Sequence, residues 1–368
     1  MKKVLLLNYE FPPLGGGAAN ATYFLLKEFS KKKDIEIDLI TSSTGEYKEE
    51  KFADNIKIYY LDIGKNEKMH SQSIKDLLLY SWKAYRHAKK LMKLKSYNIV
   101  HAFFGIPCGY IAMKLGLPYI VSLRGSDVPF FNERYTLLDR LIFKRLSGKI
   151  WKKAKAVIAN SEELKALALK SHPNQKIDII HNGVDVDTFQ NVPSSKRDKF
   201  TILCVSRLTS RKGISFLIKA FAKLNSTNDC VLTIVGGGNR EIELKNLAKD
   251  LGVDKSIEFL GAVSKEEIPK SYRSSDVFVL PSLYEGMSNS CLEAMASGIP
   301  VVTTDTGGMK ELLDNDMIIR KQDSESIFEV LNKLKNSPEL CQQIGQSNLK
   351  TAEQMKWSVV AEKYLKLY

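Results

Sequence analysis

Long apolar runs are missing from this chain of 368 residues, and none approaches the roughly 20 residues that a membrane-spanning helix needs. The basic start MKKVLLLN has too few apolar residues for a signal peptide, so we expect a buried first strand there. The five cysteines are scattered and form no CxxC pair, which favours reduced thiols. No zinc-binding pattern or aromatic RNA-binding motif is present, so we expect no nucleic-acid partner. These absences predict a cytoplasmic protein.

Acidic residues are too few in the first half of the chain to balance the basic ones. Residues 1–185 hold 31 of the 55 Lys and Arg but only 19 of the 42 Asp and Glu, so nearly all of the +13 excess lies there. Two explanations fit this charge equally well: a solvated helix face, and a surface that meets anionic lipid headgroups. The second would make the protein peripheral on the inner face of a membrane. Two stretches concentrate the charge: Lys83, Arg86, Lys89, Lys90, Lys93 and Lys95, and Arg140, Lys144, Arg145, Lys149, Lys152, Lys153 and Lys155.

Short apolar runs alternate with longer segments of helical periodicity. Because the runs are continuously apolar, they predict strands buried on both faces, as in parallel sheets covered by helices. The alternating order predicts a doubly wound α/β fold. The expected strands are 4–7, 37–40, 56–61, 99–102, 119–123, 157–159 and 177–180, then 201–205, 231–235, 257–259, 277–280, 301–304 and 317–319.

The strand and helix pattern restarts near residue 200. The polar stretch QNVPSSKRDKF, residues 190–200, precedes this restart and is typical of a linker. We therefore predict two similar domains, 1–190 and 191–354. The segment 355–368 has helical spacing and apolar anchors, and we expect a C-terminal helix that packs on either domain.

The segment PSLYEGMSNSCLEAMASGIPVV, residues 281–302, follows a predicted strand and opens a helix near Cys291. A helix start after a strand favours anion binding, because backbone N–H groups and the helix dipole point at the ligand. Glu285 and Glu293 can face the same crevice, where a carboxylate accepts hydrogen bonds from sugar hydroxyls. The alternative for Glu293 is a capping box with Ser290 as N-cap. The amides expected at the helix start are those of Met287, Ser288, Asn289 and Ser290.

A second basic motif, SRLTSRKG at residues 206–213, follows the first strand of the second half. Arg207 and Lys212 lie close enough along this loop to converge on one anion. A planar guanidinium and a point-charge ammonium both suit a pyrophosphate. On composition alone, Arg211 could replace either residue, and an ordinary basic loop remains an alternative.

Glycine loops follow two predicted strands, PPLGGGAAN at 12–20 and VGGGNR at 235–240. Neither is a GxGxxG fingerprint, and tight turns explain both equally well. His101 ends the strand in VHAFFG, while Arg124 ends the next one. The carboxyl ends of strands line the ligand crevice of α/β sheets, which makes His101 a catalytic candidate beside its alternative as a structural residue.

Taken together, these motifs resemble those of retaining glycosyltransferases of family 4, which have the GT-B fold. Glu285 and Glu293, with Arg207 and Lys212 upstream, are similar to the family's donor-site signature. The resemblance covers nearly the whole chain. It includes Gly15–Gly17, VHAFFGIP, LPYIVSLRGSD and HNGVDVDTF, then SRLTSRKG, IVGGG, FLG, SSDVFVLPSLYEGMSNSCLEAMASGIPVV and TGGMKEL.

The resemblance implies two Rossmann-like domains facing across a cleft, with the acceptor in the first domain and a UDP- or GDP-linked sugar in the second. Arg207 and Lys212 would stabilise the departing pyrophosphate, without any metal or other cofactor. Glu293 would hold the ribose, and Glu285 would lie near the transferred sugar. The resemblance further implies backbone contacts to the donor from Met287, Ser288 and Asn289, and from Gly16 or Gly17 of the first domain.

Two positions depart from the family pattern. The family's frequent His-x-His is His101-Ala102-Phe103 here, and its frequent His-Gly is Arg124-Gly125. Either His101 substitutes for the second histidine, or a pyrophosphate oxygen assists the acceptor, or the activity is altered. We expect a hexose transferase for cell-envelope polysaccharide or glycolipid synthesis, acting on a saccharide or lipid-linked acceptor. The alternatives are an epimerase, a phosphorylase or an inactive nucleotide-sugar-binding protein.

Overall fold

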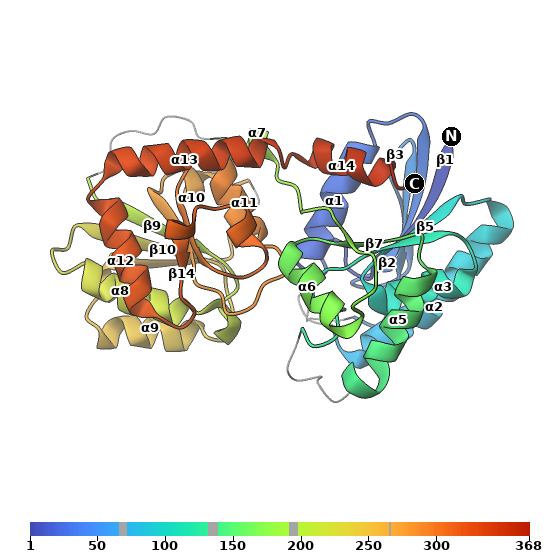
Figure 1. Ribbon diagram of the computed structural model, residues 1–368, viewed down its shortest axis with the longest axis horizontal. Coiled ribbons are helices and arrows are strands. Elements are labelled where there is room, and N and C mark those ends of the chain that lie inside the picture. Colours follow the sequence, from blue (N-terminus) through green and yellow to red (C-terminus); the bar gives the residue numbers. More distant parts are fainter. Residues whose placement is uncertain (66–71, 132–138, 191–197, 265) are drawn as a thin grey trace. The chain divides into compact units, whose positions relative to one another are not determined.

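The computed structural model describes residues 1–65, 72–131, 139–190, 198–264 and 266–368. The chain forms two compact units (Figure 1). The first unit comprises Met1–Asn182 together with Trp357–Tyr368, and the second unit comprises Gly183–Lys356. All five cysteines are free, and four of them are buried. None of the described helices has the length and apolar character needed to span a membrane.

The first unit is built on an eight-stranded sheet in the order β3-β4-β2-β1-β5-β6-β7-β8. Every neighbouring pair is parallel except β3 and β4, which are antiparallel. The sequence reading missed β3, because its residues KEEKFA are mostly charged and it forms the sheet edge. The strands are β1 (Lys2–Leu7), β2 (Ile35–Ser42), β3 (Lys48–Ala53), β4 (Ile56–Leu61), β5 (Ile99–Phe103), β6 (Tyr119–Ser122), β7 (Ala156–Ala159) and β8 (Asp178–Ile179).

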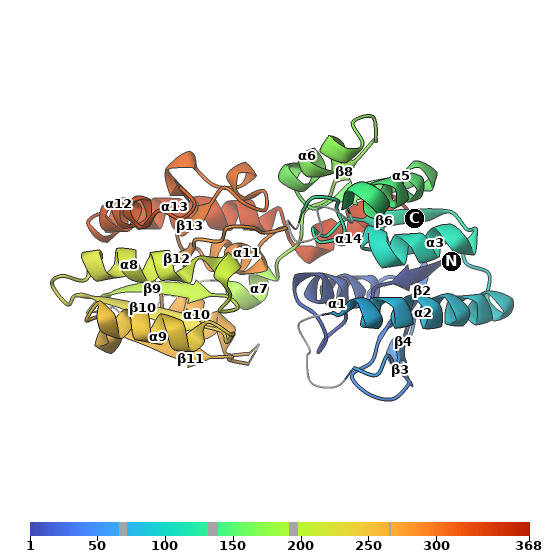
Figure 2. The same cartoon turned by 90° about the horizontal axis from the view of Figure 1, so that it is seen from below.

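Helices cover this sheet. α2 packs against α3, and α3 packs against α5 (Figure 2). α14 packs against α1, where the rings of Phe24 and Trp357 stack with centroids 5.6 Å apart. The helices are α1 (Gly17–Phe29), α2 (Ile74–Leu94), α3 (Tyr110–Leu115), α5 (Lys144–Lys153), α6 (Glu162–Ser171) and α14 (Trp357–Leu365).

The second unit has a six-stranded, wholly parallel sheet in the order β11-β10-β9-β12-β13-β14. The strand order reverses between β9 and β12, and in the first unit it reverses between β1 and β5, so both units are doubly wound. The strands are β9 (Phe200–Val205), β10 (Cys230–Val235), β11 (Ile257–Gly261), β12 (Val277–Leu280), β13 (Val301–Thr304) and β14 (Ile318–Ile319). The helices are α7 (Val186–Phe189), α8 (Ile214–Leu224), α9 (Glu241–Asp250), α10 (Ile268–Arg273), α11 (Asn289–Ala296), α12 (Ser324–Lys335) and α13 (Pro338–Glu353).

The boundary between the units falls after Asn182, earlier than the boundary predicted after residue 190. The physical reason is that Val184, Val186 and Phe189 are buried in the second core. Most of the expected linker, residues 191–197, lies outside the described residues. The C-terminal helix belongs to the first unit, because Trp357 and other apolar side chains of α14 join the first core.

Candidate active site

The candidate site lies at the carboxyl ends of β9 and β12, where the strand order of the second unit reverses. Ligands of open α/β sheets bind at such switch points, because the loops of the two adjacent strands run in opposite directions and leave a crevice. The loop after β9 carries Arg207 and Lys212, and the loop after β12 carries Glu285 and leads to the start of α11. The fold thus brings the two strongest sequence motifs to one edge of one sheet.

Lys212 and Glu285 form an ion pair that joins the two loops, in which the Lys212 ammonium donates to Oε1 of Glu285. Ser282 Oγ donates to the same carboxylate oxygen at 2.8 Å. The two side chains are only 13% and 15% exposed, so solvent screens the pair weakly. The switch point therefore holds a paired cation and anion. An anionic ligand could replace the Glu285 carboxylate as the partner of Lys212.

Close backbone contacts hold these loops in place. Gly213 has φ of 63°, and a Cβ there would overlap the carbonyl oxygen of Pro281. A Cβ at Gly236, which belongs to the glycine loop VGGGNR, would overlap the carbonyl oxygen of Ser206. The amide of Leu208 donates to the carbonyl of Gly237 at 2.9 Å. The glycine loop therefore supports the Arg207–Lys212 loop by allowing its backbone to approach closely.

The helix α11 begins two residues earlier than the capping-box alternative requires. Its N-cap is Ser288, whose Oγ accepts from the amide of Cys291 at 3.4 Å. Glu293 therefore lies in the second turn, too far along the helix to fold back onto the N-cap amide, and the Ser290 capping box is wrong. Met287 and Ser288 are buried, whereas Asn289 is partly exposed at the helix start.

Tyr272 of α10 orients the carboxylate of Glu293. Its hydroxyl lies 3.0 Å from Oε2 of Glu293 and 3.1 Å from the carbonyl oxygen of Ser290. Burial, together with the negative charge of Glu293, raises the pKa of Tyr272 well above its usual value, so the hydroxyl stays protonated as a donor. Sequence reasoning missed Tyr272, since no local pattern links SYRSSD to a helix that begins after the next strand.

Arg207 extends from the loop after β9 with an exposed side chain. The loop turns directly after it, where the amide of Thr209 donates to the carbonyl of Arg207 at 2.9 Å. This backbone turn keeps Arg207 at the same sheet edge as Lys212. Its guanidinium is therefore accessible from solvent at the edge of the sheet where the site lies.

Gly16 and Gly17 of the first unit lie at the start of α1, where both are exposed. The amide of Gly16 donates to a carboxylate oxygen of Glu10 at 3.4 Å. Gly15 has φ of 93°, which brings the glycine loop against the Glu10 side chain. An anion that approached these amides would compete with the Glu10 carboxylate for them.

His101 is a buried structural residue of the first unit. Its Nδ1 lies 2.6 Å from the Tyr368 hydroxyl, and its Nε2 lies 2.8 Å from Ser122 Oγ. The side chain has no exposed surface, and burial lowers the pKa of His101 well below its usual value. Both ring nitrogens of His101 thus have hydrogen-bond partners inside the protein. The sequence could not show this, because Tyr368 is at the other end of the chain.

The two departures from the family pattern are in direct contact. The guanidinium of Arg124 lies over the ring of Phe103, with its Cζ 4.3 Å from the ring centroid. One terminal nitrogen of Arg124 donates to Asn182 Oδ1 at 2.8 Å, and the other donates to the Tyr364 hydroxyl at 3.3 Å. The ring of Phe103 therefore supports the guanidinium of Arg124 through a cation–π contact.

The neutral state of His101 makes the stability of the first unit dependent on pH. An unfolded histidine binds a proton below about pH 6.5, whereas His101 in the folded protein does not, so stability falls as pH falls. The expected loss from this one group is about 1.4 kcal/mol per pH unit below that point. Denaturant unfolding of the wild type and of His101→Asn across this range measures it. Equal pH slopes for the two proteins would contradict the assignment.

Among the described residues, no group of three or more His, Cys, Asp or Glu side chains gathers as ligands gather around a metal ion.

Comparison with known proteins places this geometry in a family. A model of glycosyl transferases group 1 matches residues 185–351, and a model of glycosyltransferase family 4 matches residues 15–188. An uncharacterised glycosyltransferase of Methanocaldococcus jannaschii is 26% identical over 86% of this chain and 83% of its own length. An α-1,3-galactosyltransferase of Escherichia coli, which uses UDP-Gal and α-D-GlcNAc-diphosphoundecaprenol, is 31% identical over 66% of this chain and 67% of its own length.

Among solved structures, sucrose-phosphate synthase from Thermosynechococcus elongatus superposes with a TM-score of 0.87 at 18% identity, covering 100% of this chain and 98% of that one. This similarity concerns the fold. The family models match both units, one each. The chain therefore belongs to the family 4, group 1 glycosyltransferases and has their GT-B fold.

Proposed function

We propose that this glycosyltransferase transfers a hexose from a UDP- or GDP-linked donor with retention of the anomeric configuration. The observation that carries the proposal is the Lys212–Glu285 pair at the switch point of the second unit. A largely buried ammonium there, beside the exposed guanidinium of Arg207, suits a diphosphate better than a neutral ligand. The E. coli relative, whose name specifies a UDP-linked sugar, supports the same donor class.

The proposed chemistry starts with an exchange of partners on Lys212. The arriving diphosphate takes the place of Glu285, and Lys212 and Arg207 neutralise the negative charge that grows on the leaving phosphate. Glu285 is then free to contact the transferred sugar. Because His101 is buried with both nitrogens engaged, a phosphate oxygen of the leaving group accepts the proton of the acceptor hydroxyl. The acceptor oxygen attacks the anomeric carbon of the sugar on the same face from which the diphosphate departs, so the anomeric configuration is retained.

Glu293 holds the ribose in this proposal. Tyr272 occupies one of its carboxylate oxygens, so the carboxylate has a fixed orientation before the donor arrives. A pre-oriented carboxylate can accept hydrogen bonds from two adjacent hydroxyls without losing further side-chain entropy. The amides of Met287, Ser288 and Asn289 at the start of α11, and Gly16 or Gly17 of the first unit, are the proposed backbone contacts.

The proposed acceptor is a saccharide or lipid-linked sugar of cell-envelope polysaccharide or glycolipid synthesis, bound by the first unit. The E. coli relative, whose named acceptor is a diphosphoundecaprenol-linked sugar, supports this class. We propose that the enzyme works without a metal, does not bind nucleic acid, and acts from the cytoplasm at the inner face of a membrane.

A ligand screen followed by product analysis tests the proposal. Nucleotide sugars are added to the full chain in the presence of EDTA, and a specific donor at 100 times its Kd should stabilise the protein by about 2.7 kcal/mol. Glu293→Gln should weaken that shift, whereas the matched change Glu339→Gln on the exposed start of α13 should leave it intact. Proton NMR of the product then reports the anomeric configuration.

Three outcomes would contradict this function. Turnover of the donor without any acceptor would indicate an epimerase. A visible absorbance band of pyridoxal phosphate would indicate a phosphorylase. Tight donor binding without transfer to any saccharide or lipid-linked acceptor would indicate a binding protein.

A further inference from the structure

The helix α2 of the first unit carries large apolar side chains on the side that faces solvent. Ile74, Leu78 and Trp82 are 63%, 66% and 55% exposed. The opposite side of the helix is buried through Tyr80 and its neighbours, as expected of a helix packed on a sheet. A helix that packs on a protein core normally turns polar residues outward, so this second apolar row is unexplained by the fold.

The outward apolar row continues into a basic one. Ile74, Leu78 and Trp82 are spaced four residues apart and form a line along the first half of α2. In the second half, four basic side chains point outward. We define the outer face of α2 as Ile74, Leu78, Trp82 and Tyr85 followed by Arg86, Lys89, Lys90 and Lys93.

Two of these four basic side chains, Arg86 and Lys89, lie over aromatic rings. Arg86 lies over the ring of Trp82 at 4.9 Å, and Lys89 lies over the ring of Tyr85 at 5.9 Å. In the parts of the chain that the structure describes, no carboxylate forms an ion pair with Arg86, Lys89, Lys90 or Lys93. Among the described residues, the charge of these four side chains is therefore not balanced by ion pairs.

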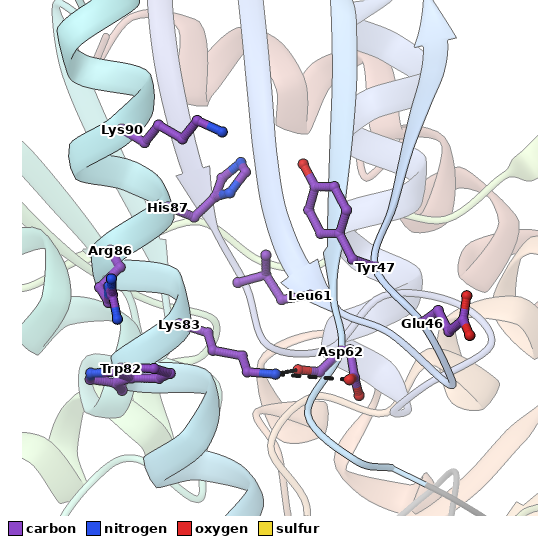
Figure 3. Close-up of a pocket in the computed structure, with 9 residues that line it drawn as sticks. All are labelled: Glu46, Tyr47, Leu61, Asp62, Trp82, Lys83, Arg86, His87 and Lys90. Atoms are coloured by element: carbon purple, nitrogen blue, oxygen red, sulfur yellow. Dashed lines mark hydrogen bonds and ion pairs between the residues drawn. The ribbon is translucent and has the colours of Figure 1, made fainter.

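A groove of about 740 Å³ runs beside this face, between α2 and the end of β4 (Figure 3). Lys83 spans it by donating to the carbonyl oxygen of Asp62 at 2.5 Å. Lys83 is thereby held, while Arg86 and Lys90 line the groove without an acidic partner in the described structure. The other lining residues are Glu46, Tyr47, Leu61, Trp82 and His87.

We propose that the outer face of α2 lies in the surface of an anionic phospholipid bilayer. Ile74, Leu78 and Trp82 enter the boundary between headgroups and acyl chains. The basic half contacts lipid phosphates, one of which enters the groove at Arg86 and Lys90. This inference rests on the proposed work at a membrane surface and deepens it, but it does not depend on the donor chemistry of the second unit.

The chemistry of the face favours a bilayer over a protein partner. An interfacial helix combines exposed Trp and Leu with Lys and Arg, because the apolar side chains insert while the cations stay hydrated among the headgroups. A protein interface would have to desolvate the lysines, which are depleted at interface cores for that reason. The excess positive charge of residues 1–185 adds attraction of the same sign.

Trp82 is a built-in reporter of this contact. The chain has three tryptophans, and the other two, Trp151 and Trp357, are 0% and 5% exposed. With the full chain and phosphatidylglycerol-containing vesicles, we expect Trp82 emission to shift to shorter wavelength and to be quenched by lipids brominated near the headgroup. Trp82→Phe should abolish the optical change while most of the protein still floats with the vesicles.

Flotation of variants identifies the residues responsible. Leu78→Glu and the double change Lys89→Glu with Lys93→Glu should each reduce vesicle binding at least about tenfold. The control changes Ile242→Glu and Lys249→Glu place an apolar-to-Glu and a Lys-to-Glu substitution on exposed positions of α9 in the second unit, and they should leave binding unchanged. High salt should weaken wild-type binding.

Several outcomes would overturn the proposal. They are the absence of flotation with anionic vesicles at low salt, equal binding by Leu78→Glu and the wild type, or a fall in oligomeric mass in Leu78→Glu without loss of flotation, which would indicate a protein interface. The thermal shift given by the nucleotide sugar separates this test from the proposed function. A Leu78→Glu protein that keeps the shift but no longer floats supports the membrane face, whatever the donor proves to be.

Discussion

Replacing Lys212 by alanine should reduce kcat/KM for sugar transfer by about 100-fold or more, the usual cost of losing a group that stabilises transition-state charge. The fall should appear mainly in kcat, because the charge on the leaving phosphate grows during bond cleavage. Lys212→Arg should recover part of the activity by restoring the charge without the geometry of an ammonium. Initial-rate kinetics with a fixed acceptor measure the effect.

The second unit offers a matched control for this substitution. Lys223 also forms a Lys–Glu ion pair, with Glu325, but on the exposed surface and away from the switch point. Lys223→Ala removes the same side chain from the same kind of pair, and transfer should continue at nearly the wild-type rate. Near-normal turnover by Lys212→Ala would remove Lys212 from the leaving-group role.

The second large effect is expected at Gly213, which joins the Lys212 turn to α8. A left-handed residue with a side chain costs about 1–2 kcal/mol, and at Gly213 the added Cβ would also strike the carbonyl oxygen of Pro281. Since that oxygen belongs to the backbone, the two site loops must move apart. We expect Gly213→Ala to lower the free energy of unfolding by more than about 2 kcal/mol and to weaken donor binding.

Gly252 separates the two costs. It has φ of 69°, close to the 63° of Gly213, but nothing lies within 4 Å of the position of its Cβ. Gly252→Ala therefore carries the conformational cost alone, about 1–2 kcal/mol, and should leave donor affinity unchanged. Denaturant unfolding and donor titration of both variants give the comparison. Equal losses at the two sites would show that the contact with Pro281 does not hold the loops.

The central strands of both sheets could be located from the sequence because they are buried on both faces. Runs such as Val4–Leu7 and Val277–Leu280 are fully buried, so continuous apolar sequence was a sufficient signal. The edge strand β3 gave no such signal, since a strand with one neighbour keeps charged residues. The switch-point loops could also be recognised, because each directly follows a strand.

Contacts between distant parts of the chain account for what the sequence could not show. The boundary after Asn182 depends on Val184 and Val186 being buried in the second core, and the side chains alone do not say which core they enter. Tyr272 reaches Glu293 from a separate helix. The stacking of Arg124 on Phe103 needs β5 and β6 to be neighbours before it can form.

The return of the chain to the first unit has a consequence for biosynthesis. Trp357 stacks on Phe24, and the Tyr368 hydroxyl is hydrogen-bonded to His101. The first core therefore lacks five of its buried residues until residues 357–368 have left the ribosome. The nascent second unit, whose residues are contiguous from Gly183 to Lys356, has all of its own core before that moment. The first unit, most of which is made earlier, is therefore the later of the two to have all of its residues available.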